Sequence, residues 1–384
     1  MRDLIIFNAR VVSGDKLLEN QFILIRDGCI ISISMKKIPP KKQTQLIDAQ
    51  GLLLTPGLID IQINGGFGFD FSHNPESIWE VGKQLIRIGV TSFLPTMITS
   101  PMEKIQKALD IWKAGKPDDY LGAFPLGWHI EGPFLNPEKK GAHRVEYLKS
   151  PELSLISDWN PKNGVKLVTL APELPGSEDV IRKLVSAGVV VSLGHSTATS
   201  QQADNAFRWG ARAGTHLYNA MQGLHHREPG LTGALLSNEQ IFAGLIVDGI
   251  HVHPQMVKLA YQAKGAGHLI LITDAMEALG MPIGRYFLAG KEVEVDSQSA
   301  RLTDGTLAGS VLSLPEAVKN MVRFSGCSYL EAFQMATETP ARLLGLKFKG
   351  SIAIGQDADL VLWDEDLKAR MVIVSGKIVY NHTE

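Results

Sequence analysis

The 384-residue chain contains 38 lysine and arginine side chains and 40 aspartate and glutamate side chains, which gives a formal net charge of −2. This near-balance provides no electrostatic basis for binding nucleic acid or an anionic membrane. The length allows one large domain or two of ordinary size, and the two cysteines are too few for a disulfide framework.

The N-terminal segment, MRDLIIFNARVVSGD, has a short apolar run that gives way to polar residues within a few positions. This pattern is typical of a β-strand and not of a secretory signal peptide. No apolar stretch of the sequence approaches the ~20 residues that a membrane-spanning helix needs. We therefore expect a cytoplasmic protein without a membrane partner.

Both ends of the chain carry short β-type runs separated by Gly, Asp and Asn turn signals. In the first 55 residues they are LIIFNARVV, FILIRDG and CIISIS, and in the last 35 they are GSIAIG, ADLVLWD and MVIVSGKIVYN. We expect residues 1–54 and 350–384 to meet in space as one small β-sandwich domain.

Between these ends, short apolar runs alternate with helical patterns such as SEDVIRKLVSAG and PQMVKLAYQAK, which indicates a parallel sheet with crossover helices. About eight runs occur, the number that closes a (β/α)8 barrel. They are LIDIQI (58–63), VTSFLPT (90–96), LGWHIE (126–131), KLVTLAPE (166–173), VVVSLGH (189–195), ARAGTH (211–216), AGLIVD (243–248) and LILITD (269–274). The predicted fold class is α/β, with a TIM-like (β/α)8 barrel over residues 55–349 beside the β-sandwich domain.

Residues that can bind a metal or move a proton stand at the ends of most of these runs. They are Gln62, Asn64, Glu131, His195, His216, Asp248, His251 and Asp274. Taken alone, each has an ordinary structural interpretation, such as a helix cap for Asp274. All eight C-terminal strand ends of a barrel meet on one face, however, so together these residues predict a shared site. Nine of the eleven histidines lie between His129 and His268, which supports this interpretation.

Metal-assisted hydrolysis is the chemistry that this set supports. Glu131, His195 and His216 provide three ligands and leave a position for water, as in catalytic zinc sites. A bound metal lowers the pKa of water from ~16 toward ~7 and polarises a scissile carbonyl. The free carboxylate of Asp274 can take the proton of the water and return it to the leaving group.

The segment PGLIDIQINGG has Gln62 and Asn64 where many such enzymes carry two histidines one residue apart. Neutral amides are poor ligands for a borderline metal beside imidazole and carboxylate. We therefore expect one metal ion in the site and not two.

With these residues identified, the chain closely resembles the amidohydrolase superfamily, essentially from end to end. The resemblance rests on the motifs PGLIDIQINGG, GWHIEGPFLNPEKKGAH, SLGHSTA, GTHLYNAMQGLHHREPG, VDGIHVHP, LITDAM and TLAGS. The motifs GWHIEGPFLNPEKKGAH and GTHLYNAMQGLHHREPG are long and specific, whereas the shortest ones alone would carry little weight.

The resemblance implies hydrolysis of the 2-acetamido group of N-acetyl-D-glucosamine 6-phosphate to D-glucosamine 6-phosphate and acetate, in amino-sugar catabolism. It implies Glu131, His195 and His216 as metal ligands and Asp274 as general base and then acid, with His143 as a second catalytic residue. The substrate contacts that it implies are Ala142, His143, Asn219, Ala220, Arg227, Asp248, His251, Leu307, Ala308 and Gly309.

The resemblance further implies a homodimer with one divalent metal per subunit, in which Arg227 and His251 are candidates for contacts across the interface. Zinc is our first choice, and Fe2+, Co2+ or Mn2+ also suit the ligands. The loop GLHHREPG places Arg227 among polar and Gly/Pro residues, which suits a bidentate grip on a phosphate. His225, His226 and His253 receive no role.

Two other interpretations remain open. A dihydroorotase-like or hydantoinase-like enzyme of the same superfamily usually keeps the two strand-one histidines and a lysine at the end of strand four, where this chain has TLAPE. A non-catalytic barrel scaffold would also lack the histidine pair, but it would have no need to keep Glu131, His195, His216 and Asp274 together. Bound metal in the purified protein would distinguish an enzyme from a scaffold.

Overall fold

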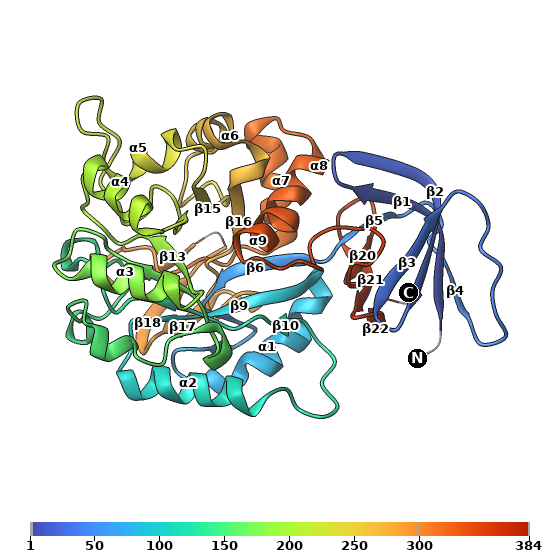
Figure 1. Ribbon diagram of the computed structural model, residues 1–384, viewed down its shortest axis with the longest axis horizontal. Coiled ribbons are helices and arrows are strands. Elements are labelled where there is room, and N and C mark those ends of the chain that lie inside the picture. The colour runs from blue at the N-terminus through green and yellow to red at the C-terminus, as the bar shows by residue number, and fades with distance from the viewer. Residues whose placement is uncertain (1–2, 298, 383–384) are drawn as a thin grey trace.

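The computed structural model describes residues 3–297 and 299–382. Figure 1 shows an α/β barrel beside a smaller all-β region, into which both ends of the chain run. This architecture confirms the predicted fold class, a TIM-like barrel with an additional β-sheet domain.

The barrel is built from eight parallel strands. The strands are β6 (Leu58–Ile63), β9 (Val90–Ile98), β11 (Trp128–Glu131), β12 (Val165–Leu170), β13 (Val190–Leu193), β14 (Ala213–Gly214), β15 (Phe242–Ile246) and β16 (Leu269–Ile272). They pair in chain order, and a parallel bridge between Ile63 and Ala275 joins the last strand end to the first. Because their side chains are largely buried on both faces, these strands appear in the sequence as continuous apolar runs.

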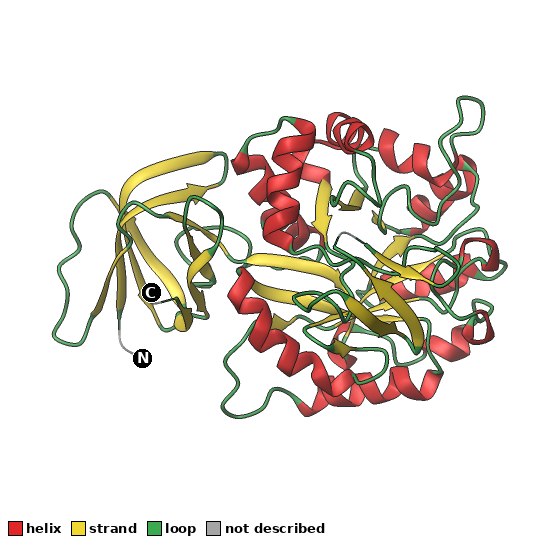
Figure 2. Cartoon of the chain, turned by 180° about the vertical axis from the view of Figure 1, so that it is seen from behind, coloured by secondary structure: helices red, strands yellow, loops and turns green. Residues whose placement is uncertain are grey.

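Helices surround the strands (Figure 2). They are α1 (Ile78–Leu85), α2 (Met102–Ala114), α3 (Ser177–Ser186), α4 (Ser200–Trp209), α5 (Gly230–Ser237), α6 (Pro254–His268), α7 (Leu314–Ser325), α8 (Tyr329–Ala336) and α9 (Glu338–Leu343). Local sequence sets several ends: α4 begins with a capping box between Thr199 and Gln202 and ends at Gly210, whose φ is 111°. Within the described residues, every helix is too short or too polar to cross a bilayer.

The two ends of the chain form one hydrogen-bonded sheet of eight strands. Its strands are β1 (Leu4–Ser13), β2 (Lys16–Arg26), β3 (Cys29–Ser34), β4 (Gln45–Asp48), β5 (Leu53–Pro56), β20 (Leu360–Trp363), β21 (Ala369–Val374) and β22 (Lys377–Asn381). The antiparallel pair β5 and β20 joins the two chain ends, and Leu54 and Leu362 on this pair belong to one apolar core separate from that of the barrel. The boundaries 1–54, 55–349 and 350–384 stay a prediction.

A three-stranded antiparallel sheet follows β16, in a segment for which the sequence analysis gave no element. Its strands are β17 (Gly284–Leu288), β18 (Lys291–Val295) and β19 (Ala300–Leu302). The alternation in KEVEV, after an Ala-Gly turn, was the signal that could have revealed it. Leu288 and Val293 pack against Ile98 and Met276, so this sheet lies against the carboxyl ends of the barrel strands. The short strands are β7 (Gly65–Gly66), β8 (Phe69–Asp70) and β10 (Phe124–Pro125).

Candidate metal centre

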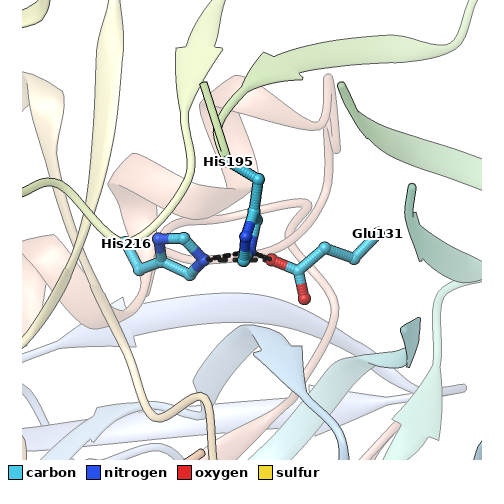
Figure 3. A group of neighbouring side chains, drawn as sticks. All are labelled: Glu131, His195 and His216. Carbon is cyan, nitrogen blue, oxygen red and sulfur yellow. Dashed lines mark hydrogen bonds and ion pairs between the residues drawn. The ribbon is translucent and has the colours of Figure 1, made fainter. Parts of the chain in front are cut away.

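Three side chains converge at the carboxyl ends of three barrel strands. Glu131 is the last residue of β11, and His195 and His216 follow β13 and β14. Glu131 Oε1 lies 3.2 Å from His195 Nε2 and 3.1 Å from His216 Nε2, and the two Nε2 atoms are 3.0 Å apart (Figure 3). All three residues are buried, and they form a group that could hold a metal ion.

The hydrogen bonds of His195 show why this group suits a cation. Its Nδ1 lies 2.8 Å from the carbonyl oxygen of Lys139. A carbonyl only accepts, so Nδ1 carries the proton and Nε2 presents a lone pair to the other two ligand atoms. Tetrahedral coordination with bonds of about 2.0–2.2 Å separates ligand atoms by about 3.3–3.6 Å. The observed separations of 3.0–3.2 Å are close to this, so the cluster fits a divalent metal.

The backbone turns sharply at these strand ends. His195, His216 and Asp274 have φ values of 49°, 32° and 48°, in or near the left-handed region that residues other than glycine seldom adopt. Such a conformation costs about 1–3 kcal/mol and persists only where the surrounding contacts fix it. Strain of this kind is therefore present at three of the residues to which the sequence assigns the chemistry.

Asp274, the candidate proton carrier, is held by the two amides that replace the histidine pair. Its Oδ1 lies 2.8 Å from Asn64 Nδ2 and 3.3 Å from Gln62 Nε2, and Gln62 Nε2 is also 3.1 Å from Glu131 Oε1. Because carboxylate oxygens accept, both amides present their N–H groups. Burial, and after it the nearby charge of Glu131, raises the pKa of Asp274.

The pKa of the ligand carboxylate, Glu131, is shifted in the opposite direction to that of Asp274. Burial alone would raise the pKa of Glu131, but the adjacent imidazoles of His195 and His216 bring this pKa well below its usual value. Glu131 is therefore ionised while Asp274, beside it, holds a proton more readily. Two buried carboxyl groups with opposite pKa shifts are a common basis for separate roles, one as ligand and one as proton carrier.

His143 supplies a directed hydrogen-bond donor. Its Nδ1 accepts from the backbone N–H of Thr99 at 3.2 Å, and the Thr99 hydroxyl lies 2.8 Å from the same nitrogen. Burial, with repulsion from His195, brings the pKa of His143 well below its usual value, so the imidazole is neutral. Nε2 therefore carries the proton, 3.8 Å from Glu131 Oε2, in a residue that lines the cavity over the metal ligands.

A cavity of about 450 Å³ opens over this group. Besides the metal ligands, Asp274 and His143, it is lined by several of the residues for which the sequence analysis predicted substrate contact. They are Ala142, Asn219, Ala220, His251, Leu307 and Gly309. The volume suits a small polar molecule the size of a phosphorylated monosaccharide.

Three predicted substrate contacts lie outside this lining. Ala308 is fully buried in the core of the inserted sheet. The carboxylate of Asp248 accepts a hydrogen bond of 2.6 Å from His251 Nδ1, so Asp248 orients His251. Arg227 is exposed on its loop, where its Nη1 lies 3.1 Å from His226 Nε2, and it does not line the cavity of its own chain.

Some cavity residues were missed by the sequence analysis. Glu138 and Lys139 belong to the quoted motif GWHIEGPFLNPEKKGAH, but nothing in the spacing marked them as cavity residues. Arg301 lies on β19 and reaches the cavity only because the inserted sheet packs there. No pattern in the sequence indicates that contact.

The fold and the cluster together define a metal-dependent hydrolase barrel, and comparison with known proteins agrees. The model described as "Amidohydrolase family" matches residues 53–379. The chain therefore belongs to the amidohydrolase family.

Within this family, the chain is similar to proteins named N-acetylglucosamine-6-phosphate deacetylase. The protein of this name from Bos taurus is 40% identical over 98% of this chain and 95% of its own length. The one from Bacillus subtilis is 39% identical over 98% and 97%. A variant of the Mycobacterium smegmatis enzyme, solved in complex with N-acetyl-D-glucosamine-6-phosphate, is 30% identical with a TM-score of 0.90, over 99% of this chain and all of its own.

Proposed function

We propose that this protein hydrolyses the acetamido group of N-acetyl-D-glucosamine 6-phosphate to D-glucosamine 6-phosphate and acetate, in amino-sugar catabolism. The observation that carries this proposal is the buried group of Glu131, His195 and His216, which faces one cavity together with Asp274. The full-length relatives named as deacetylases of this sugar phosphate support the choice of substrate.

The site holds one divalent metal, for which zinc is our first choice and Fe2+, Co2+ and Mn2+ are alternatives. Glu131, His195 and His216 hold it, and when bound it acidifies water and polarises the scissile carbonyl. Gln62 and Asn64 direct N–H groups toward Asp274, so they support a single-metal site.

Asp274 takes a proton from the attacking water and later gives it to the nitrogen as the carbon–nitrogen bond breaks. Its raised pKa helps the second of these transfers, because the carboxyl group keeps the proton until the amine accepts it. His143 donates its Nε2 proton in a hydrogen bond to the acetyl carbonyl or to a sugar hydroxyl. Its neutral state preserves that donor without adding a positive charge beside the metal.

The sugar phosphate contacts Ala142, Asn219, Ala220, His251, Leu307 and Gly309 within the cavity. We also retain Arg227 as a phosphate ligand and propose that it reaches the cavity of a second subunit in a homodimer, because it is exposed on its own chain. Asp248 acts through His251, and Ala308 acts through the packing of its turn. A cytoplasmic location is supported by the two cysteines, Cys29 and Cys327, which are both free.

A metal count combined with acetate release from N-acetylglucosamine 6-phosphate tests the proposal. We expect about one metal ion per chain, and we expect acetate release to stop after chelation and to return when Zn2+ is added. Two ions per chain would contradict the single-metal site. A fully metallated protein that releases no acetate from this sugar would contradict the substrate and direct attention to other amides.

A further inference from the structure

A half-buried carboxylate just beyond β12 connects the loops on both sides of the metal ligand His195. Glu173 Oε1 accepts hydrogen bonds from Asn136 Nδ2 at 2.9 Å and from the backbone N–H of Thr197 at 2.7 Å. Glu173 Oε2 accepts one from the Ser196 hydroxyl at 2.7 Å. The Thr197 hydroxyl lies 3.2 Å from Oε1 and adds a fourth donor.

These partners hold His195 from two directions. Ser196 and Thr197 follow it directly in the chain, while Asn136 comes from the loop after β11. The backbone N–H of Asn136 donates to the carbonyl oxygen of His195 at 3.0 Å. The Asn136 side chain also caps the turn Pro137–Lys139, whose last carbonyl accepts from His195 Nδ1. Glu173 therefore fastens both the backbone after His195 and the turn that orients its ring.

The conformation of His195 makes this support necessary. Its φ of 49° is unfavourable for a residue with a side chain, so the loop needs fixed contacts to keep it. The donors to Glu173 are all hydrogen-bonding groups of these loops, and the carboxylate has no ion pair within 4.0 Å among the described residues. Its charge is matched by N–H and O–H groups whose positions also define the ligand.

We propose that Glu173 is a positioning residue of the metal centre, which keeps His195 Nε2 directed at the bound ion. It touches neither substrate nor metal and acts through Asn136, Ser196 and Thr197. The inference rests on the proposed metal site but not on the choice of substrate, because it concerns the affinity for the ion. Outer partners of metal ligands commonly change metal affinity by about 10- to 100-fold when they are removed.

The test is the transfer of Zn2+ from the loaded protein to a chromogenic chelator. We expect E173A to weaken Zn2+ affinity by about 10- to 100-fold, and E173Q to weaken it less, since its amide oxygen still accepts. At saturating Zn2+, acetate release by E173A should recover, with KM close to that of the unchanged protein. Unchanged Zn2+ affinity in E173A together with a lower Tm would overturn the proposal and show that Glu173 only stabilises the loops.

A second pair of variants separates this role from general loop damage. E178Q, five residues beyond Glu173, removes an exposed carboxylate that pairs with Arg182, and it should leave Zn2+ affinity unchanged. N136A should weaken Zn2+ binding, and the N136A/E173A double variant should lose less than the product of the two single effects, because both residues act in one network. If the two single effects on Zn2+ affinity simply multiply in the double variant, the residues act independently and the shared network is contradicted. If E173A does not fold, the same comparison is made with E173Q.

Discussion

The floor and the rim of the cavity are built on different principles. On the floor, Glu131, His195 and His216 are buried at the ends of barrel strands, and each makes a specific contact with its neighbours. On the rim, Arg301 is exposed on the inserted sheet. The barrel thus fixes the chemistry, while the segments added to its mouth bring the groups suited to recognise the rest of a substrate.

The histidines show the same difference. His195 and His216 are buried against Glu131, whereas His225 and His226 have rings 4.4 Å apart on an exposed loop. The residue type is identical, but only the first pair converges with a third potential ligand within the described residues. Placement, and not residue type, makes a histidine a candidate ligand.

Replacing the proton carrier on the floor should have the largest effect. We expect D274N to lower kcat by about three orders of magnitude or more, because proton transfer by a positioned side chain contributes about 10²–10⁴-fold. Metal content and substrate binding should remain, since Asp274 is not among the ligand group. The measurement is steady-state kinetics together with a metal count. Turnover near that of the unchanged protein would exclude Asp274 from this role.

A buried carboxyl group lower in the barrel should make stability depend on pH. Burial raises the pKa of Asp60 to about 7 from its usual 3.8, while its Oδ2 accepts from the Thr273 hydroxyl at 2.6 Å. Between pH 3.8 and about pH 7, Asp60 keeps its proton in the folded state but has lost it in the unfolded state. The contribution of Asp60 to the free energy of unfolding is therefore greatest below about pH 4 and is lost as the pH rises to about 7.

We expect D60N to remove this dependence, since its neutral amide can still accept from Thr273. The difference in free energy of unfolding between the two proteins should change by about 3 kcal/mol between pH 5 and pH 7, at about 1.4 kcal/mol per pKa unit. Urea unfolding between pH 5 and pH 8 would measure it, with the exposed D118N as a control that shows no such trend. A difference that stays constant with pH would show that Asp60 is ionised throughout.

The amides beside Asp274 should have a smaller effect on turnover. N64A removes the 2.8 Å hydrogen bond to Asp274 Oδ1, so we expect kcat to fall by about 10- to 100-fold, in line with the loss of a charge-assisted hydrogen bond of about 1.5–3 kcal/mol. The pH at which kcat falls off should also move upward, because that hydrogen bond lowers the pKa of Asp274. An unchanged pH profile in N64A would mean that Asn64 only fills space.

The rim should show the smallest effect. Arg301 lines the cavity, where it is fixed by hydrogen bonds from Nε to the Ser299 hydroxyl at 3.2 Å and from Nη1 to the Gly305 carbonyl at 2.9 Å. We expect R301A to raise KM for the phosphorylated sugar by up to about fivefold with kcat unchanged, as exposed charge pairs contribute at most about 1 kcal/mol. The control is R285A, on strand β17 of the same sheet. Equal loss with unphosphorylated N-acetylglucosamine would mean that Arg301 does not read the phosphate.

The sequence alone determined the barrel, the family and the group Glu131, His195 and His216. These were accessible because parallel strands appear as apolar runs, and because the barrel brings every carboxyl end to one face. The same rule identified Gln62 and Asn64 as positions where ligands were replaced. It could not show that their amides donate to Asp274, since side-chain direction depends on contacts across the barrel.

Only the tertiary structure decided which loop residues reach the site. Arg301 enters the cavity because a three-stranded sheet packs against the strand ends, and Glu173 gains its role because two loops 37 and 23 residues away in sequence meet at its carboxylate. Such contacts join segments with no shared period or motif. Periodicity therefore predicts the strands and what stands at their ends, whereas the packing of loops, which have no repeating pattern, determines what surrounds them.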